Sequence, residues 1–126
     1  NPRLNALENV MLPMYINFKI KRKKRKEKAI NLLSSFGLEN RKTHYPKELS
    51  GGEQQRIAIV RALVNDPNFI LADEPTGNLD VKNEKIVFDT LRKLADNGKS
   101  VIVVSHNENI KNYADEVIYI ENGKVR

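Results

Sequence analysis

The chain has 126 residues, of which 40% are hydrophobic and 30% charged, the composition of one small globular domain. It has no cysteine, which excludes disulfides and thiolate metal sites. No apolar run approaches the roughly 18 residues that cross a bilayer, and the net charge of +6 comes from one segment rather than from the whole surface.

The first third of the chain predicts two helices. Apolar residues recur at helical spacing at Leu7, Val10, Met11 and Met14. Pro13 should end or bend this first helix, because proline has no N–H to donate. A second helix is expected over residues 23–36, and Gly37 is a C-terminal glycine stop. Its inward-facing residues should be Ile30, Leu32 and Leu33.

The basic segment, residues 19–28, overlaps the start of this second helix. It contains eight Lys or Arg and one Glu, a charge of +7, so the rest of the chain carries −1. That distribution argues against a uniformly basic nucleic-acid-binding face. Two interpretations stay open: contact with anionic headgroups or nucleic acid, where each basic residue near a charged membrane adds about 1 kcal/mol, or a solvated loop and helix start.

A third helix should begin at Ser50, after a loop over residues 43–47 in which His44 is a surface residue. Its apolar face contains Ile57, Val60, Leu63 and Val64. The turn Asn65-Asp66-Pro67 ends it. Residues 1–66 are therefore expected to be mostly helical.

The second half alternates strands with helices, which predicts an α/β sheet with parallel strands. Two apolar runs, 69–72 and 100–105, predict strands buried on both faces. A third strand is expected over 116–120. A helix with Val87, Leu91, Leu94 and Ala95 inward should end at Asn97-Gly98, and residues 108–113 should be helical. Asn122-Gly123 is a strong type I′ hairpin signal.

Two motifs indicate chemistry, and the first is Ser50-Gly-Gly-Glu53. Ser and Glu at this spacing form a capping box at a helix start. That reading does not explain Gly51 and Gly52, because glycine within a helix costs about 1 kcal/mol relative to alanine. Close approach of backbone N–H groups to an anion at a helix N-terminus supplies a reason.

The second motif is the strand end Asp73-Glu74, followed by Pro75-Thr-Gly-Asn-Leu-Asp80. Open α/β sheets bind ligands at the carboxyl ends of their strands. Adjacent carboxylates repel unless a cation relieves them, and Mg²⁺ on Asp73 suits that need. Glu74 can then orient or deprotonate a water. Asp80 is also a plain helix cap, and His106 follows the second buried strand.

Together the two motifs, in this order and separation, resemble the ATPase subunits of ATP-binding cassette (ABC) transporters. The resemblance implies the C-terminal part of a P-loop NTPase domain: an α-helical signature subdomain (1–66) and the later part of the parallel α/β nucleotide-binding core (67–126). No G-x-x-x-x-G-K-[ST] phosphate loop occurs in these residues. We expect it before Asn1, so this segment alone should not hydrolyse ATP.

By the same resemblance, ATP and Mg²⁺ are the cofactors. Glu74 and His106 would be catalytic, and Asp73 would bind the metal. The residues expected to contact nucleotide are Ser50, Gly51, Gly52, Gln54 and, at the dimer-crossing loop, Asp80. The implied partners are a membrane permease and a second ATPase subunit in a head-to-tail dimer, with no nucleic acid, at the cytoplasmic face of the membrane.

The sequences LADEPTGNLD and GGEQQR together are similar to those of one branch of the ABC family. The members of this branch export macrolides and antimicrobial peptides or release lipoproteins. The expected function is therefore ATP-powered export or extraction of an amphiphile, drug, peptide or lipoprotein. Two alternatives stay open. One is a cell-division-type ABC ATPase that signals through a membrane partner. The other is an inactive truncated subunit that acts only as a binding module.

Overall fold

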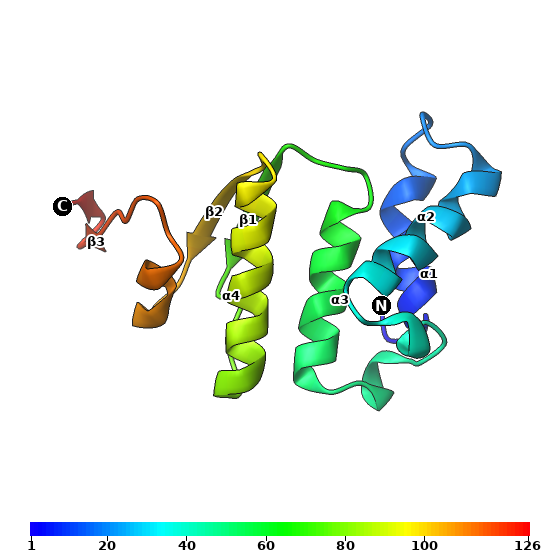
Figure 1. The fold of residues 1–126 in the computed structure, drawn as a ribbon, viewed down its shortest axis with the longest axis horizontal. Coiled ribbons are helices and arrows are strands. Elements are labelled where there is room, and N and C mark those ends of the chain that lie inside the picture. Colours follow the sequence, from blue (N-terminus) through cyan, green and yellow to red (C-terminus); the bar gives the residue numbers. More distant parts are fainter.

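A computed structural model describes residues 1–126, with a helical part followed by a small α/β part (Figure 1). The helices are α1 (Ala6–Met11), α2 (Arg22–Ser35), α3 (Gly51–Leu63) and α4 (Val81–Asp96). The strands are β1 (Phe69–Asp73), β2 (Ser100–Val104), β3 (Ile120–Glu121) and β4 (Lys124–Val125). Short 3₁₀ helices are η1 (Leu12–Tyr15), η2 (Glu39–Arg41), η3 (Pro46–Glu48) and η4 (Glu108–Asn112). None of the helices combines the length and apolar character that crossing a membrane requires.

Helix α1 begins with a reciprocal cap that the spacing of apolar residues does not reveal. The Asn5 side chain accepts from the Glu8 N–H at 2.9 Å, and the Glu8 carboxylate accepts from the Asn5 N–H at 2.8 Å. The helix tightens into η1 at Pro13, as predicted, and Met14 is fully buried there. The proline thus changes the helix type without sending the chain away from the core.

Helix α2 ends as predicted at Gly37, which has φ +70°. Its buried residues are Ala29 and Leu33, which lie one turn apart on the same face. Leu32 packs at the edge of the core. The prediction that Ile30 faces inward was wrong, since Ile30 is only half-buried. One residue along a helix is a rotation of about 100°, which takes Ile30 off the face that Ala29 and Leu33 define.

The helical part has a core of its own, to which α1, α2 and α3 contribute. Its buried members are Ala6, Val10, Met14, Ala29, Leu33, Leu38, Leu49, Ile57, Val60 and Val64. The loop before α3 belongs to this packing, because the His44 carbonyl accepts from the Ala6 N–H at 2.9 Å. His44 is therefore half-buried, with Nδ1 enclosed and without a hydrogen-bond partner, and not the simple surface residue we predicted.

Strands β1 and β2 pair in parallel, with a register from Phe69 opposite Ser100 to Asp73 opposite Val104. Helix α4 lies beside them and also packs against α3 (Figure 1). Its buried residues are Val87, Phe88 and Leu91. The assignment of residues 1–66 and 67–126 to separate subdomains remains a prediction.

The prediction that both strands are buried on two faces was wrong. Ile70 is buried on the α4 side, whereas the opposite face, which includes Phe69, Leu71, Ile102 and Val104, is exposed. Leu71 is 73% exposed and Val104 60%. The reason is that α4 covers one face, and no other element of these residues covers the second.

The strand predicted over 116–120 was also largely wrong. Only Ile120 is in a strand, and β3 pairs solely with β4 in a short antiparallel hairpin. An extended segment becomes a strand only when a neighbouring strand shares its hydrogen bonds. Among residues 116–119 only Tyr119 has such a bond, accepting from the Arg126 N–H at 2.9 Å. The Asn122-Gly123 turn is confirmed, with positive φ at both residues (52° and 73°).

Candidate functional site

Parallel pairing brings the carboxyl ends of β1 and β2 to one edge of the sheet. Glu74 follows β1 in a left-handed conformation, with φ 44°. Its carboxylate accepts hydrogen bonds from the His106 backbone N–H at 3.0 Å and from the Ser105 hydroxyl at 3.3 Å. The His106 Nε2 atom lies 3.6 Å from the same carboxylate. The structure therefore unites Glu74 with His106, which are 32 residues apart in the chain.

Two hydrogen-bond donors thus fix the direction of one acidic side chain. These donors are the backbone N–H of His106 and the hydroxyl of Ser105. The imidazole of His106 makes no hydrogen bond to Glu74 and is fully exposed. A carboxylate held this way can orient a water, while the free imidazole can reach a ligand above the sheet edge. The positive φ of Glu74 is a strained conformation for a residue other than glycine. Such conformations are concentrated at active sites and ligand-binding sites, which is consistent with a functional role for Glu74.

Asp73 lies beside them, at the end of β1 on the uncovered face of the sheet, and its side chain is exposed. No group of three His, Cys, Asp or Glu side chains converges on a point that could hold a metal ion. Mg²⁺ binds through one or two carboxylates and completes its shell with water and phosphate oxygens. The exposed carboxylate of Asp73 has this donor chemistry.

The second group of predicted site residues lies at the start of α3. The Ser50 hydroxyl accepts from the Glu53 N–H at 3.2 Å, and Glu53 accepts from the Ser50 N–H at 3.0 Å, so the capping box is present. Arg41 donates to the other Glu53 oxygen at 2.9 Å. The bond from the Ser50 backbone and the Arg41 guanidinium lower the pKa of Glu53.

The glycines of this motif have different surroundings. Gly51 is exposed, and a Cβ there would meet only Leu79 Cδ2, at 3.6 Å. Gly52 is buried, and a Cβ there would overlap the amide of Asn83 on α4. Packing of α3 against α4 thus requires Gly52, a reason that sequence reasoning missed when it ascribed both glycines to an anion.

Gln54 and Asp80 are engaged within the chain. The Gln54 amide donates to the carbonyls of Pro46 and Leu49, at 2.9 and 3.2 Å. Asp80 caps α4 by accepting from the Asn83 N–H at 2.8 Å. No hydrogen bond or ion pair joins the α3 start to Glu74 or His106, so the predicted residues form two separate groups.

Sequence reasoning also missed Glu84. Its carboxylate accepts from the side-chain amides of Asn107 at 2.6 Å and Asn109 at 2.9 Å. Glu84 thereby ties α4 to the loop that contains His106. Asn107 and Asn109, one and three residues after His106, were the sequence feature that could have indicated this contact. Only the fold shows that Glu84 is their partner.

Comparison with known proteins agrees with this arrangement. The family described as ABC transporter matches residues 1–77, more than half of the chain. The chain belongs to this family. The resemblance drawn from the two motifs is confirmed, and so is the fold class of an ABC ATPase cassette.

Several relatives have closely similar sequences. An ABC transporter ATP-binding protein of Thermotoga maritima is 50% identical over 124 residues, which are 98% of this chain and 53% of that protein. YvrO of Bacillus subtilis is 45% identical over 98% of this chain and 54% of its own length. The lipoprotein-releasing system ATP-binding protein LolD of Hyphomonas neptunium is 46% identical over 98% of this chain and 54% of its own length.

Among solved structures, the dimeric ATP-binding cassette MJ0796, in a post-hydrolysis state bound to ADP and Pi, superposes with a TM-score of 0.85. It is 40% identical to this ABC chain, and the match covers 99% of this chain and 56% of MJ0796. The chain thus spans about half the length of the relatives it matches.

Proposed function

We propose that the complete protein containing this chain hydrolyses ATP to power export or extraction of an amphiphile, drug, peptide or lipoprotein through a membrane permease. The observation that carries the proposal is Glu74, oriented by Ser105 and by the backbone of His106 at the carboxyl edge of a parallel sheet. The names of the LolD relatives support lipoprotein release within that range.

In this proposal each residue has a distinct task. Phosphoryl transfer to water needs chiefly positioning and charge stabilisation. Glu74 orients the attacking water and accepts its proton, and the exposed imidazole of His106 contacts the terminal phosphate. Asp73 contributes to binding Mg²⁺, which offsets phosphate charge when bound.

The start of α3 serves a second nucleotide. Ser50 and Gly51 are exposed at the N-terminus of a 13-residue helix, where N–H groups favour an anion. Because this group is separate from Glu74, we propose that it contacts ATP on a second ATPase subunit in a head-to-tail dimer. Gly52, Gln54 and Asp80 support the geometry of that contact. The dimeric MJ0796 structures support such an assembly, and the permease would hold it at the cytoplasmic face of the membrane.

The test is Glu74→Gln in the complete protein. We expect binding of a fluorescent ATP analogue to remain and hydrolysis to fall by about 10²-fold or more, the usual cost of losing a general base. Glu116→Gln, at an exposed position away from the sheet edge, is the matched control and should hydrolyse ATP normally. Turnover by Glu74→Gln near the wild-type rate would overturn the role of Glu74.

The substrate class needs a separate measurement. The purified ATPase and its permease, reconstituted together, should hydrolyse ATP faster when the transported substrate is added. Stimulation by an acylated lipoprotein and not by a macrolide would narrow the proposal to lipoprotein release. A complex that no candidate substrate stimulates would favour the cell-division type, which signals through a membrane partner instead of moving a substrate.

A further inference from the structure

Large apolar side chains are exposed on the loop between η1 and α2. Phe18 is 94% exposed, Ile16 79% and Tyr15 53%. A single exposed apolar residue is ordinary, but three within four positions form a patch that water disfavours. The loop projects at one end of the helical part, and no other element of the chain covers it (Figure 1).

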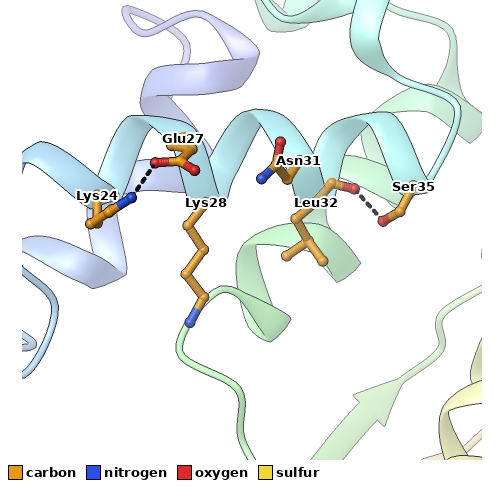
Figure 2. A pocket seen from close by; sticks show the side chains of 6 residues that line it. All are labelled: Lys24, Glu27, Lys28, Asn31, Leu32 and Ser35. Carbon is orange, nitrogen blue, oxygen red and sulfur yellow. Dashed lines mark hydrogen bonds and ion pairs between the residues drawn. The ribbon is translucent and has the colours of Figure 1, made fainter.

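The residues that follow carry the basic charge, and most of it has no acidic partner. Lys24 pairs with Glu27 at 2.9 Å, and Arg25 lies over the Tyr15 ring, 5.3 Å from its centre. Lys28 extends toward the loop after α3 (Figure 2), where the hydrogen bond from Lys99 lowers the pKa of Asp66 and the charge of Lys28 adds a smaller effect. Besides Arg25 and Lys28, the basic residues of this segment without an ion pair are Lys19, Lys21, Arg22, Lys23 and Lys26.

These five lie at or before the first turns of α2, where positive charge is unfavourable. The N-terminus of a helix carries a partial positive charge and favours acidic residues. Helix α2 has none in its first turn and no side-chain cap. Mutual repulsion and the helix dipole therefore both oppose this arrangement. An external anion would remove both penalties, so helix stability gives no reason for these residues.

Farther along α2 the surface changes character. A shallow hollow there is lined by Lys24, Glu27, Lys28, Asn31, Leu32 and Ser35 (Figure 2). Glu27 neutralises Lys24 within it, and Ser35 donates to the Leu32 carbonyl. The basic residues outside this hollow and without a partner thus lie toward the N-terminal end of the helix, a few positions after Ile16 and Phe18 in the chain.

We propose that residues 15–28 bind the surface of an anionic lipid bilayer. Ile16 and Phe18 enter the boundary between headgroups and acyl chains, and the basic side chains contact lipid phosphates and carboxylates. Apolar groups beside a cluster of Lys and Arg are the combination that interfacial membrane binding uses. A nucleic acid would satisfy the charge, but it offers no apolar medium for Ile16, and the rest of the chain, at −1, adds no net positive charge to attract it.

This interaction is independent of ATP hydrolysis and can be measured without the permease. The complete protein is sedimented with vesicles of phosphatidylcholine, with or without phosphatidylserine. We expect binding only to the mixed vesicles, and weaker binding as salt shortens the Debye length below about 10 Å. The triple variant Lys21→Gln/Lys23→Gln/Lys26→Gln should bind on the order of 100-fold more weakly, and Phe18→Ser should also bind more weakly.

The matched control is Lys47→Gln/Lys93→Gln/Lys124→Gln, which removes the same charge from exposed lysines elsewhere. It should bind like wild type. Equal loss in both triple variants, or equal binding to uncharged vesicles, would overturn the proposal. So would tighter binding to RNA than to mixed vesicles in competition. ATPase assays of the same samples without lipid should give wild-type rates, which separates this test from that of Glu74.

Discussion

Gly52 of α3 packs so closely against Asn83 of α4 that an added Cβ would lie 3.0 Å from the Asn83 Cβ and would overlap its amide. Asn83 cannot simply turn away, because its amide donates to Asp80 at 2.9 Å. The start of α3 is therefore packed directly against the N-terminal cap of α4.

Gly52→Ala should consequently destabilise the fold. Overpacking costs about 1–3 kcal/mol, which outweighs the gain of about 1 kcal/mol that alanine brings to a helix. In an Asn83→Ala background the overlap with the amide disappears and only the contact with the Cβ at 3.0 Å remains, so the same substitution should cost less stability. Urea unfolding of the four proteins of this cycle measures the coupling. Gly51→Ala, with open space around it, is the control; additive effects of Gly52→Ala and Asn83→Ala would refute the packing argument.

Glu84 is expected to act on the site through the loop that contains His106. Glu84→Ala removes both acceptors of Asn107 and Asn109, and we expect the turnover number to fall by up to about 10²-fold, since small misplacements have such effects. Nucleotide affinity should not change. Glu84→Gln retains an acceptor and should give an intermediate rate.

Asp89→Asn on the same helix removes an equal charge from a surface pair with Lys85 and serves as control. If Glu84→Ala lowered nucleotide affinity and turnover together, Glu84 would have a wider role than positioning the loop.

Glu53 should make stability depend on pH in the acid range. Its pKa is held below the ordinary value of 4.5 by the Ser50 backbone N–H and by Arg41. A lowered pKa means that the ionised form stabilises the fold above the unfolded-state pKa, and that this contribution is lost as the pH falls through the folded-state pKa. The unfolding free energy of wild type should exceed that of Glu53→Gln by a constant amount from neutral pH to about 5.

Below 4.5 the two proteins should converge, because wild type then becomes protonated. Urea titrations at a series of pH values measure this difference. A gap that persists unchanged into strong acid would show that the glutamate charge is not responsible.

Arg92 is expected to hold the C-terminal segment on α4. It donates to the Tyr113 carbonyl at 3.1 Å and to Asp115 at 2.7 Å, while its other nitrogens contact Asp96. Arg92→Ala should speed amide hydrogen exchange around residues 113–116 by about twofold to fivefold, a small effect because solvent screens exposed ion pairs. Lys93→Ala, at the neighbouring exposed position, should leave exchange unchanged. If Arg92→Ala and wild type exchanged at the same rate, the contact between the Phe88 and Tyr113 rings, not Arg92, would hold the C-terminal segment on α4.

The amino-acid sequence by itself determined the features that depend on a few neighbouring residues. The Ser50–Glu53 capping box, the glycine stop at Gly37 and the Asn122-Gly123 turn are present as predicted. Each is specified within about four positions by hydrogen bonds or by a φ that glycine and asparagine tolerate. The two motifs that identified the family are local in the same sense.

Only the tertiary structure decided what depends on distant partners. The uncovered face of β1 and β2, the missing strand at 116–119 and the half-buried position of Ile30 could not be predicted, because burial and pairing depend on which elements pack nearby. The same holds for Gly52 against Asn83 and for Glu84 beside Asn107. The type of a side chain determines which interactions it can make. Which partner it meets depends on how segments tens of residues apart in the chain pack together.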